Sequence, residues 1–193
     1  MNNLKSWLLV FVLIASAFAL SSAPLPRKSP EFTIYETSGK TTLLSGLQGK
    51  VVVLEFFFVQ SEHCLRVARM LNNLHSELGP RGFQPVGVAF DPPNGPNAGG
   101  QLVTYVVDNF KLTYPVGYSP KADVDTYLGR ARNEVLNIPQ VVVIDRTGMI
   151  RASTGGRGGD PSLEDESSLR NLIEQLLREG EASAPHANPL KRK

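Results

Sequence analysis

The stretch Val51-Val-Val-Leu-Glu-Phe-Phe-Phe-Val-Gln-Ser-Glu-His-Cys64 decides the fold of this chain. Residues 51–59 are almost all apolar and rich in β-branched and aromatic side chains, which is typical of a strand that is buried on both faces of its sheet. From Glu62 to Leu78 the apolar residues recur at helical spacing instead. The stretch therefore predicts a central strand that leads into a helix, with the only cysteine, Cys64, in the first turn of that helix.

The rest of the chain predicts further strands and helices around this pair. We expect strands or extended segments at 31–35, 41–44, 83–90, 114–116, 140–145 and 149–153, and helices at 102–110, at 122–128 and from 160 to Gly180. This order is typical of an α/β domain with three layers, in which a central mixed sheet has helices on both faces. Parallel strands come first, and an antiparallel hairpin follows them.

The N-terminus predicts export. Lys5 precedes an apolar run over residues 7–18, and Ala17-Phe18-Ala19 fits a small-x-small cleavage site. We therefore interpret 1–19 as a signal peptide or, if it is not cleaved, as an N-terminal anchor that tethers the protein to a membrane. Residues 20–30 are interpreted as a linker, 31–180 as the folded domain and 181–193 as a disordered basic tail. The expected location is periplasmic, either free or membrane-anchored and facing the periplasm.

Composition excludes several classes of function. The net charge of +2 and the scattered basic residues argue against nucleic acid as a partner. Three histidines and one cysteine show no metal-ligand spacing, so we expect neither a metal nor another cofactor. A single cysteine cannot form an internal disulfide, although exported proteins live where disulfides persist. Cys64 is therefore expected either to be buried or to have a chemical function.

Four blocks in order resemble the thioredoxin superfamily, namely Gly49-Lys-Val-Val-Val-Leu-Glu-Phe-Phe-Phe, Ser61-x-x-Cys64, Gly82-Phe-Gln-Pro-Val-Gly-Val-Ala and Ile138-Pro139-Gln-Val-Val-Val-Ile-Asp145-Arg-Thr-Gly148. The chain is most similar to the exported TlpA/ResA-like thioredoxins, which overlap with the AhpC/TSA (peroxiredoxin-like) redoxin family. The resemblance covers about residues 30–177 and implies a thioredoxin-like fold. One departure is central, because Ser61 stands where the first cysteine of Cys-x-x-Cys would be.

The resemblance also implies roles for several residues. Pro139 occupies the place of the cis-proline opposite the redox motif, and the backbone of Ile138 would pair with an extended partner. Glu55 matches the buried acid that handles the proton of the second cysteine. The residues alone leave two alternatives for Glu55: a desolvated carboxyl with a raised pKa, or a strand-end carboxyl that points to water.

Two residues next to the thiol are further candidates. Ser61 is expected to cap the helix, and its hydroxyl could donate a hydrogen bond to a Cys64 thiolate. His63 adjoins Cys64 and is a candidate substrate-binding residue, although neighbouring helix positions do not face each other and a solvent-exposed side chain is the simpler expectation.

Three functions remain open. In the first, Cys64 forms a mixed disulfide with a thiol or disulfide of a partner protein or a small thiol, and an external reductant resolves it. In the second, the protein is a one-Cys peroxiredoxin-like peroxide reductase with the pattern Pro-x-x-x-(Thr/Ser)-x-x-Cys. In that pattern Phe57 replaces the proline, and the arginine is missing unless Arg130 or Arg132 substitutes for it. In the third, the fold is a redox-inactive partner-binding module in which Cys64 is a small buried hydrophobe.

Overall fold

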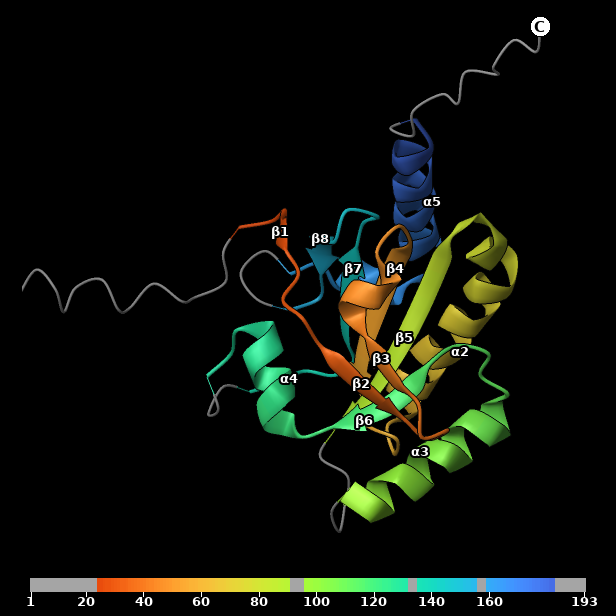
Figure 1. The fold of residues 1–193 in the computed structure, drawn as a ribbon, viewed down its shortest axis with the longest axis vertical. Helices are drawn as coiled ribbons and strands as arrows, with labels where there is room; N and C mark the ends of the chain where they lie inside the picture. Colours follow the sequence, from red (N-terminus) through yellow and green to blue (C-terminus); the bar gives the residue numbers. More distant parts are fainter. Residues whose placement is uncertain (1–23, 91–95, 132–134, 156–158, 183–193) are drawn as a thin grey trace, which may run out of the picture.

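The computed structural model describes residues 24–90, 96–131, 135–155 and 159–182. The predicted signal peptide, 1–19, lies outside these residues. In the described part, the strands form one sheet in the order β1-β8-β7-β4-β5-β6-β2-β3 (Figure 1). The strands are β1 (Arg27–Lys28), β2 (Thr33–Glu36), β3 (Thr41–Leu43), β4 (Val51–Phe57), β5 (Phe83–Phe90), β6 (Val116–Ser119), β7 (Gln140–Ile144) and β8 (Met149–Ser153).

The sheet is mixed, as the sequence predicted. Strands β4, β5 and β6 run parallel, whereas β7 runs antiparallel to β4 and forms the expected hairpin with β8. Every residue of β4 and β5 is buried. This burial explains why both strands are almost continuously apolar, since each has a covered surface on both sides.

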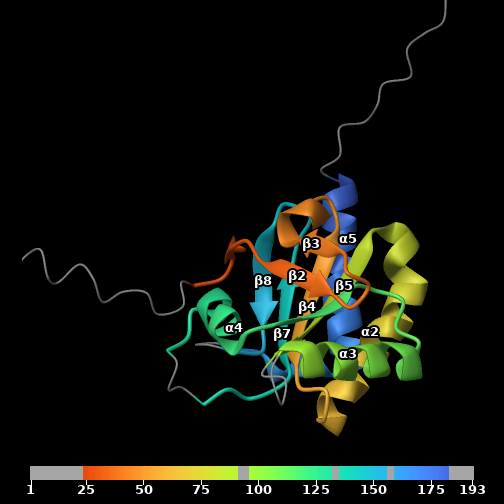
Figure 2. The same cartoon turned by 60° about the horizontal axis from the view of Figure 1, so that its bottom comes forward.

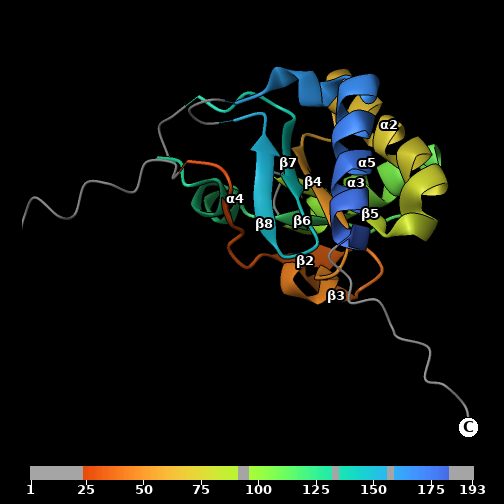
Figure 3. The same cartoon turned by 90° about the horizontal axis from the view of Figure 1, so that it is seen from above.

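Helices cover both faces of the sheet. They are α2 (Glu62–Leu78), α3 (Pro96–Phe110), α4 (Lys121–Leu128) and α5 (Glu166–Ala182), with short 3-10 turns η2 (Leu44–Leu47), η3 (Gly79–Arg81) and η4 (Pro161–Glu164). Apolar residues of α2, α3 and α5 pack into one core cluster, and those of α4 pack into a second. Figures 2 and 3 show α2 and α5 on one side of the sheet and α4 on the other. The result is the three-layer thioredoxin-like fold.

Several boundaries differ from the sequence-based expectation. Helix α3 begins at Pro96 instead of residue 102, and β6 begins at Val116, after Pro115, which has no amide hydrogen to give to a ladder. The supposed linker 20–30 contains β1, in which Arg27 pairs with Ile150 of β8. A strand of two residues, such as β1, is too short to show a periodic pattern in the sequence. It forms because β8 has an open edge with which it can pair.

The C-terminal boundary also differs. Helix α5 continues to Ala182, two residues into the segment 181–193 that was expected to be a tail, and 183–193 lie outside the described residues. Over the ranges that the structure describes, none of the helices has the length and apolar character needed to cross a membrane.

The close approach of β6 to β2 gives a test of this fold. A Cβ atom at Gly117 would collide with the carbonyl of Tyr35 and lie 2.8 Å from Cγ2 of Ile34. We predict that Gly117→Ala lowers the free energy of unfolding by roughly 1–3 kcal/mol, because the strands must separate to admit the methyl group. Urea denaturation measures the loss. Gly46→Ala is the matched control, since nothing lies within 4 Å of its Cβ position. Equal stability of the two variants would contradict this pairing of β2 and β6.

Candidate active site around Cys64

The single thiol lies at the start of α2. Residues 58–61 connect the end of β4 to this helix. Ser61 is the N-cap, and its Oγ accepts a hydrogen bond from the backbone N–H of Cys64 at 3.3 Å. The expected cap is therefore confirmed, and Cys64 occupies the first turn. The whole residue is inaccessible to solvent, and it packs in the core cluster that contains Phe57 and Val141.

The surroundings of Cys64 favour the protonated thiol. Burial raises the pKa of the Cys64 thiol above its ordinary value of 9.0, and the charge of Glu55 raises it further. Hydrogen bonds from the Ser61 hydroxyl and the backbone of Phe58 oppose this rise without overcoming it. The Arg69 guanidinium, on the same helix, lies over the ring of Phe110, 4.8 Å from its centre. A thiol in these surroundings needs a base before it can act as a nucleophile.

Glu55 is the candidate for that base, because its charge acts on the Cys64 thiol. Along β4, Val51, Val53 and Phe57 belong to the core cluster under α2, and the alternation of strand side chains places Glu55 on this same face. Both of its carboxyl oxygens are buried and have no hydrogen-bond partner. Burial, followed by the charge of Glu164, holds the pKa of Glu55 well above its ordinary value. Of the two alternatives for Glu55, the structure supports the desolvated carboxyl.

Sequence reasoning missed a third titratable group in this core, Tyr114. Its hydroxyl donates a hydrogen bond to the carbonyl of Ala68 in α2 at 3.1 Å. Burial, and then the charge of Glu55, raises the pKa of Tyr114 well above its ordinary value. Cross-strand pairing brings positions 55 and 114 together, because Glu55 pairs with Gly87 and Gly87 pairs with Val116. The spacing of residues along the chain does not indicate that positions 55 and 114 are close in space. Cys64, Glu55 and Tyr114 are called the buried titratable cluster below.

The residues around position 139 lie at the same end of the sheet as Cys64. The Ile138–Pro139 peptide bond is cis, and Pro139 is buried. Gln140 of β7 pairs with Phe56 of β4. Pro139, the residue before Gln140, therefore lies beside the carboxyl end of β4, where the chain turns toward α2. Ile138 is half-buried and packs against both core clusters. The fold thus gathers the predicted motif and the predicted proline at one end.

His63 points to a neighbour that the sequence did not indicate. Its Nε2 lies 2.8 Å from Oε2 of Glu164 in η4, and its side chain is 46% exposed. His63 is thus exposed, as its place at a helix start suggested, and its role as a substrate-binding residue stays a prediction. Glu164 was missed because an acidic residue about a hundred positions downstream of the motif has no pattern that links it to the thiol.

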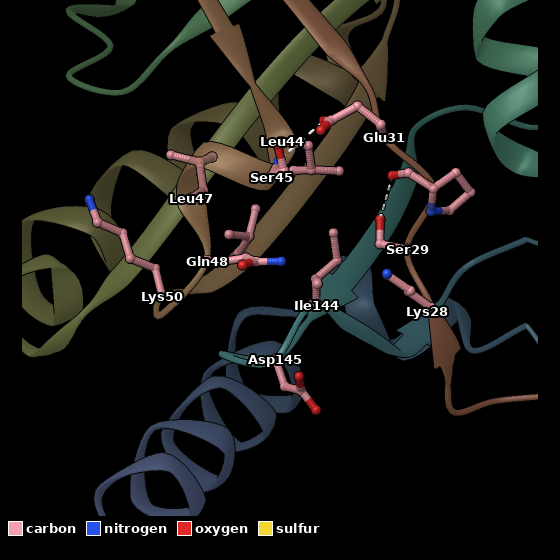
Figure 4. A pocket seen from close by; sticks show the side chains of 13 residues that line it. Lys28, Ser29, Glu31, Leu44, Ser45, Leu47, Gln48, Lys50, Ile144 and Asp145 are labelled. Atoms are coloured by element: carbon pink, nitrogen blue, oxygen red, sulfur yellow. Dashed lines mark hydrogen bonds between the residues drawn. The ribbon is translucent and has the colours of Figure 1, made fainter. Parts of the chain in front are cut away.

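Two other candidate features lie away from Cys64. Arg130 forms an ion pair with the buried Asp125 of α4 at 2.7 Å, and Arg132 lies outside the described residues. A cavity of about 250 Å³, lined by Val52, Ile144 and other residues, opens at the opposite end of the central strands (Figure 4). Across the described ranges, no group of three or more His, Cys, Asp or Glu residues could hold a metal ion.

The burial of Glu55 predicts a pH-dependent stability. Its folded pKa is raised, so the native state retains a proton that the unfolded chain loses near pH 4.5, and stability falls as the pH rises above that value. Glu55→Gln removes this loss. We predict that the variant gains stability relative to the parent as the pH rises, by up to about 1.4 kcal/mol per pH unit, in urea unfolding measured from pH 4.5 upward. Parallel curves for the two proteins would contradict the burial of an unpartnered carboxyl.

Comparisons with known proteins agree with this architecture. A thiol:disulfide interchange protein of the thioredoxin family from Chlorobium tepidum has a TM-score of 0.64 at 20% identity, over 81% of this chain and 99% of that one. A candidate protein disulfide isomerase from Bacteroides thetaiotaomicron has a TM-score of 0.64 at 26% identity, over 83% and 94%. A secreted disulfide oxidoreductase from Mycobacterium tuberculosis has a TM-score of 0.57 at 17% identity, over 75% and 96%. No curated protein matches this sequence.

The family follows from a sequence match over most of the domain. The matched region, residues 26–153, runs from the segment of β1 to the end of β8 and includes both Cys64 and Pro139. The match covers more than half of the chain, and the fold agrees with it. This chain belongs to the AhpC/TSA family.

Proposed function

We propose that this protein is an exported thiol-redox protein that works through Cys64 alone, by disulfide exchange with an external partner. One observation carries the proposal. The thiol shares the core under α2 with Glu55, a buried carboxyl whose oxygens have no hydrogen-bond partner. Its raised pKa keeps it protonated at low pH and makes its ionised form a stronger base than an ordinary carboxylate. A buried thiol with a raised pKa and a buried base form a proton-transfer pair.

Disulfide exchange at Cys64 begins with the loss of the thiol proton. Ionised Glu55 takes the proton of the Cys64 thiol, and the thiolate attacks one sulfur of a partner disulfide. The partner's S–S bond breaks, its second sulfur leaves as a thiolate, and Cys64 is held in a mixed disulfide. Ser61 has no sulfur with which to resolve this bond, so a second external thiol must attack it and release Cys64. The protein therefore needs an external reductant and no cofactor.

The partner would approach at the end of the sheet that carries the motif. The backbone of Ile138, next to Pro139, would pair with an extended segment of the partner. Phe58, which is 36% exposed and packs at a tilt against the ring of Phe90, adds an apolar surface at the same end. We also propose export through residues 1–19, which leaves the domain periplasmic after cleavage or tethered if the segment is retained. The fold shared with a secreted disulfide oxidoreductase supports this location.

A redox-inactive partner-binding module is the second candidate function. The complete burial of Cys64 favours it, since structural buried cysteines are inert. The peroxiredoxin-like alternative has less support, because Arg130 is already paired with Asp125. Rapid formation of a sulfenic acid on Cys64 under peroxide would favour the peroxiredoxin-like reaction over disulfide exchange.

Reaction with glutathione disulfide distinguishes a Cys64 thiol that takes part in disulfide exchange from one that is inert. We predict that the folded protein gains one glutathionyl group, seen by intact-mass spectrometry, and that Cys64→Ser gains none. Glu55→Gln should slow the reaction roughly 10–100-fold, because the thiol loses its base. A native protein that remains unmodified, although its unfolded form reacts, would contradict exchange and support the binding module.

Restoring the missing sulfur tests the placement of the motif. We predict that Ser61→Cys forms an intramolecular disulfide with Cys64 and reduces insulin in the presence of dithiothreitol, because the N-cap and the first turn bring the two positions together. Ser61→Ala, which also loses the cap, serves as the control and should show neither property. If Ser61→Cys retains two free thiols under oxidising conditions, residues 61 and 64 are not placed as described.

A further inference from the structure

The cavity at the amino end of β4 lies at the opposite end of this strand from Cys64. Its volume is about 250 Å³, and it is bordered by residues 28–31, by η2, by the start of β4 and by the end of β7 (Figure 4). Leu44, Val52 and Ile144 line it, and all three belong to the apolar core cluster on the α4 face of the sheet. Because a dry cavity of about 150 Å³ holds benzene, this one has room for an aromatic ring with a short substituent.

Two polar side chains point into this cavity from opposite sides. Figure 4 shows the ammonium group of Lys28 and the amide group of Gln48 directed toward the middle of the cavity, beside Ile144. In the part of the chain that the structure describes, neither side chain forms a hydrogen bond or an ion pair with another residue. Both groups can therefore donate hydrogen bonds to a bound molecule.

The other charged side chains that line the cavity already have partners. Glu31 accepts two backbone hydrogen bonds, at 2.9 and 3.1 Å. Asp145 forms an ion pair with Arg151 at 3.1 Å, and its carboxylate points away from the cavity (Figure 4). The ammonium group of Lys50 donates to a glutamine of β5 at 3.0 Å. Among the described lining residues, the charge that has no partner is thus the positive charge of Lys28, which favours an anion as the ligand.

We propose that this cavity binds a small organic monocarboxylate, an acid whose body is an aromatic ring or a branched apolar chain. The carboxylate lies between Lys28 and Gln48 and accepts hydrogen bonds from both, while the apolar body covers Val52 and Ile144. Burial of the body supplies most of the affinity, and the ammonium group selects for the negative charge. A ligand of this size, held by one ion pair near the surface, has a dissociation constant in the millimolar range. The inference is independent of disulfide exchange, because it uses none of the residues around Cys64.

Titration of the ¹⁵N-labelled protein with phenylacetate, followed by two-dimensional NMR, tests the site. We expect saturable shifts of the backbone signals of residues 44–52 and 144–148. Lys28→Gln should weaken binding roughly 2–5-fold, because it removes the positive charge that meets the carboxylate. Lys50→Gln is the matched control. It removes the same charge from the border of the same cavity, but this ammonium group points away from the cavity, so the affinity should not change (Figure 4).

Two further ligands separate the charge from the apolar body. Phenylacetamide has the same ring without the charge, and we expect it to bind the parent more weakly than phenylacetate but Lys28→Gln about equally well. Acetate has the charge without the ring and should give no saturable shift. Equal affinity of the parent for phenylacetate and phenylacetamide, equal losses in the two lysine variants, or shifts that do not localise to this cavity would overturn the proposal. Exchange at Cys64 is measured separately with glutathione disulfide, so either proposal can fail without the other.

Discussion

The site depends on one unusual placement, a carboxyl group in the middle of a buried strand with no hydrogen-bond partner. Glu55 interrupts the apolar run of β4, and both of its oxygens are cut off from solvent. An unsatisfied buried acid costs stability, and proteins retain such groups chiefly where they serve a function. Its neighbours in the buried titratable cluster, Cys64 and Tyr114, are both affected by its charge. The chemistry proposed for the thiol follows from this arrangement.

The serine at position 61 limits what a single thiol can do while leaving the architecture of the fold in place. Ser61 still caps α2, because a hydroxyl accepts the backbone hydrogen bond of Cys64. Cys64, the single cysteine of the sequence, is buried and has no internal disulfide partner. Helix capping and core packing therefore stabilise the fold whether or not the protein catalyses a redox reaction. Both a one-thiol exchange protein and a binding module are compatible with the same frame, and they differ in whether Glu55 can deprotonate the thiol.

Much of the fold could be predicted because it depends on local patterns. The bounds of α2, β5 and β8 follow from strong periodicity and clear turn residues, and the N-cap follows from the residue type at position 61. The site could be predicted only where a motif marks it, as at Cys64 and Pro139. Tyr114 and Glu164 reach the site through sheet pairing and the docking of η4, and short elements such as β1 form at an available edge. Neither kind of contact leaves a periodic signal in the chain.

The central claim is that Glu55 retains its proton above the pH at which an ordinary glutamate loses it. Infrared difference spectroscopy between the parent and Glu55→Gln, recorded at rising pH, measures this directly. The account predicts a carbonyl band from a protonated, unbonded carboxyl that persists above pH 4.5 and is absent from the variant. If the difference spectrum contains only carboxylate bands once pH 4.5 is passed, Glu55 is solvated and cannot be the buried base of Cys64.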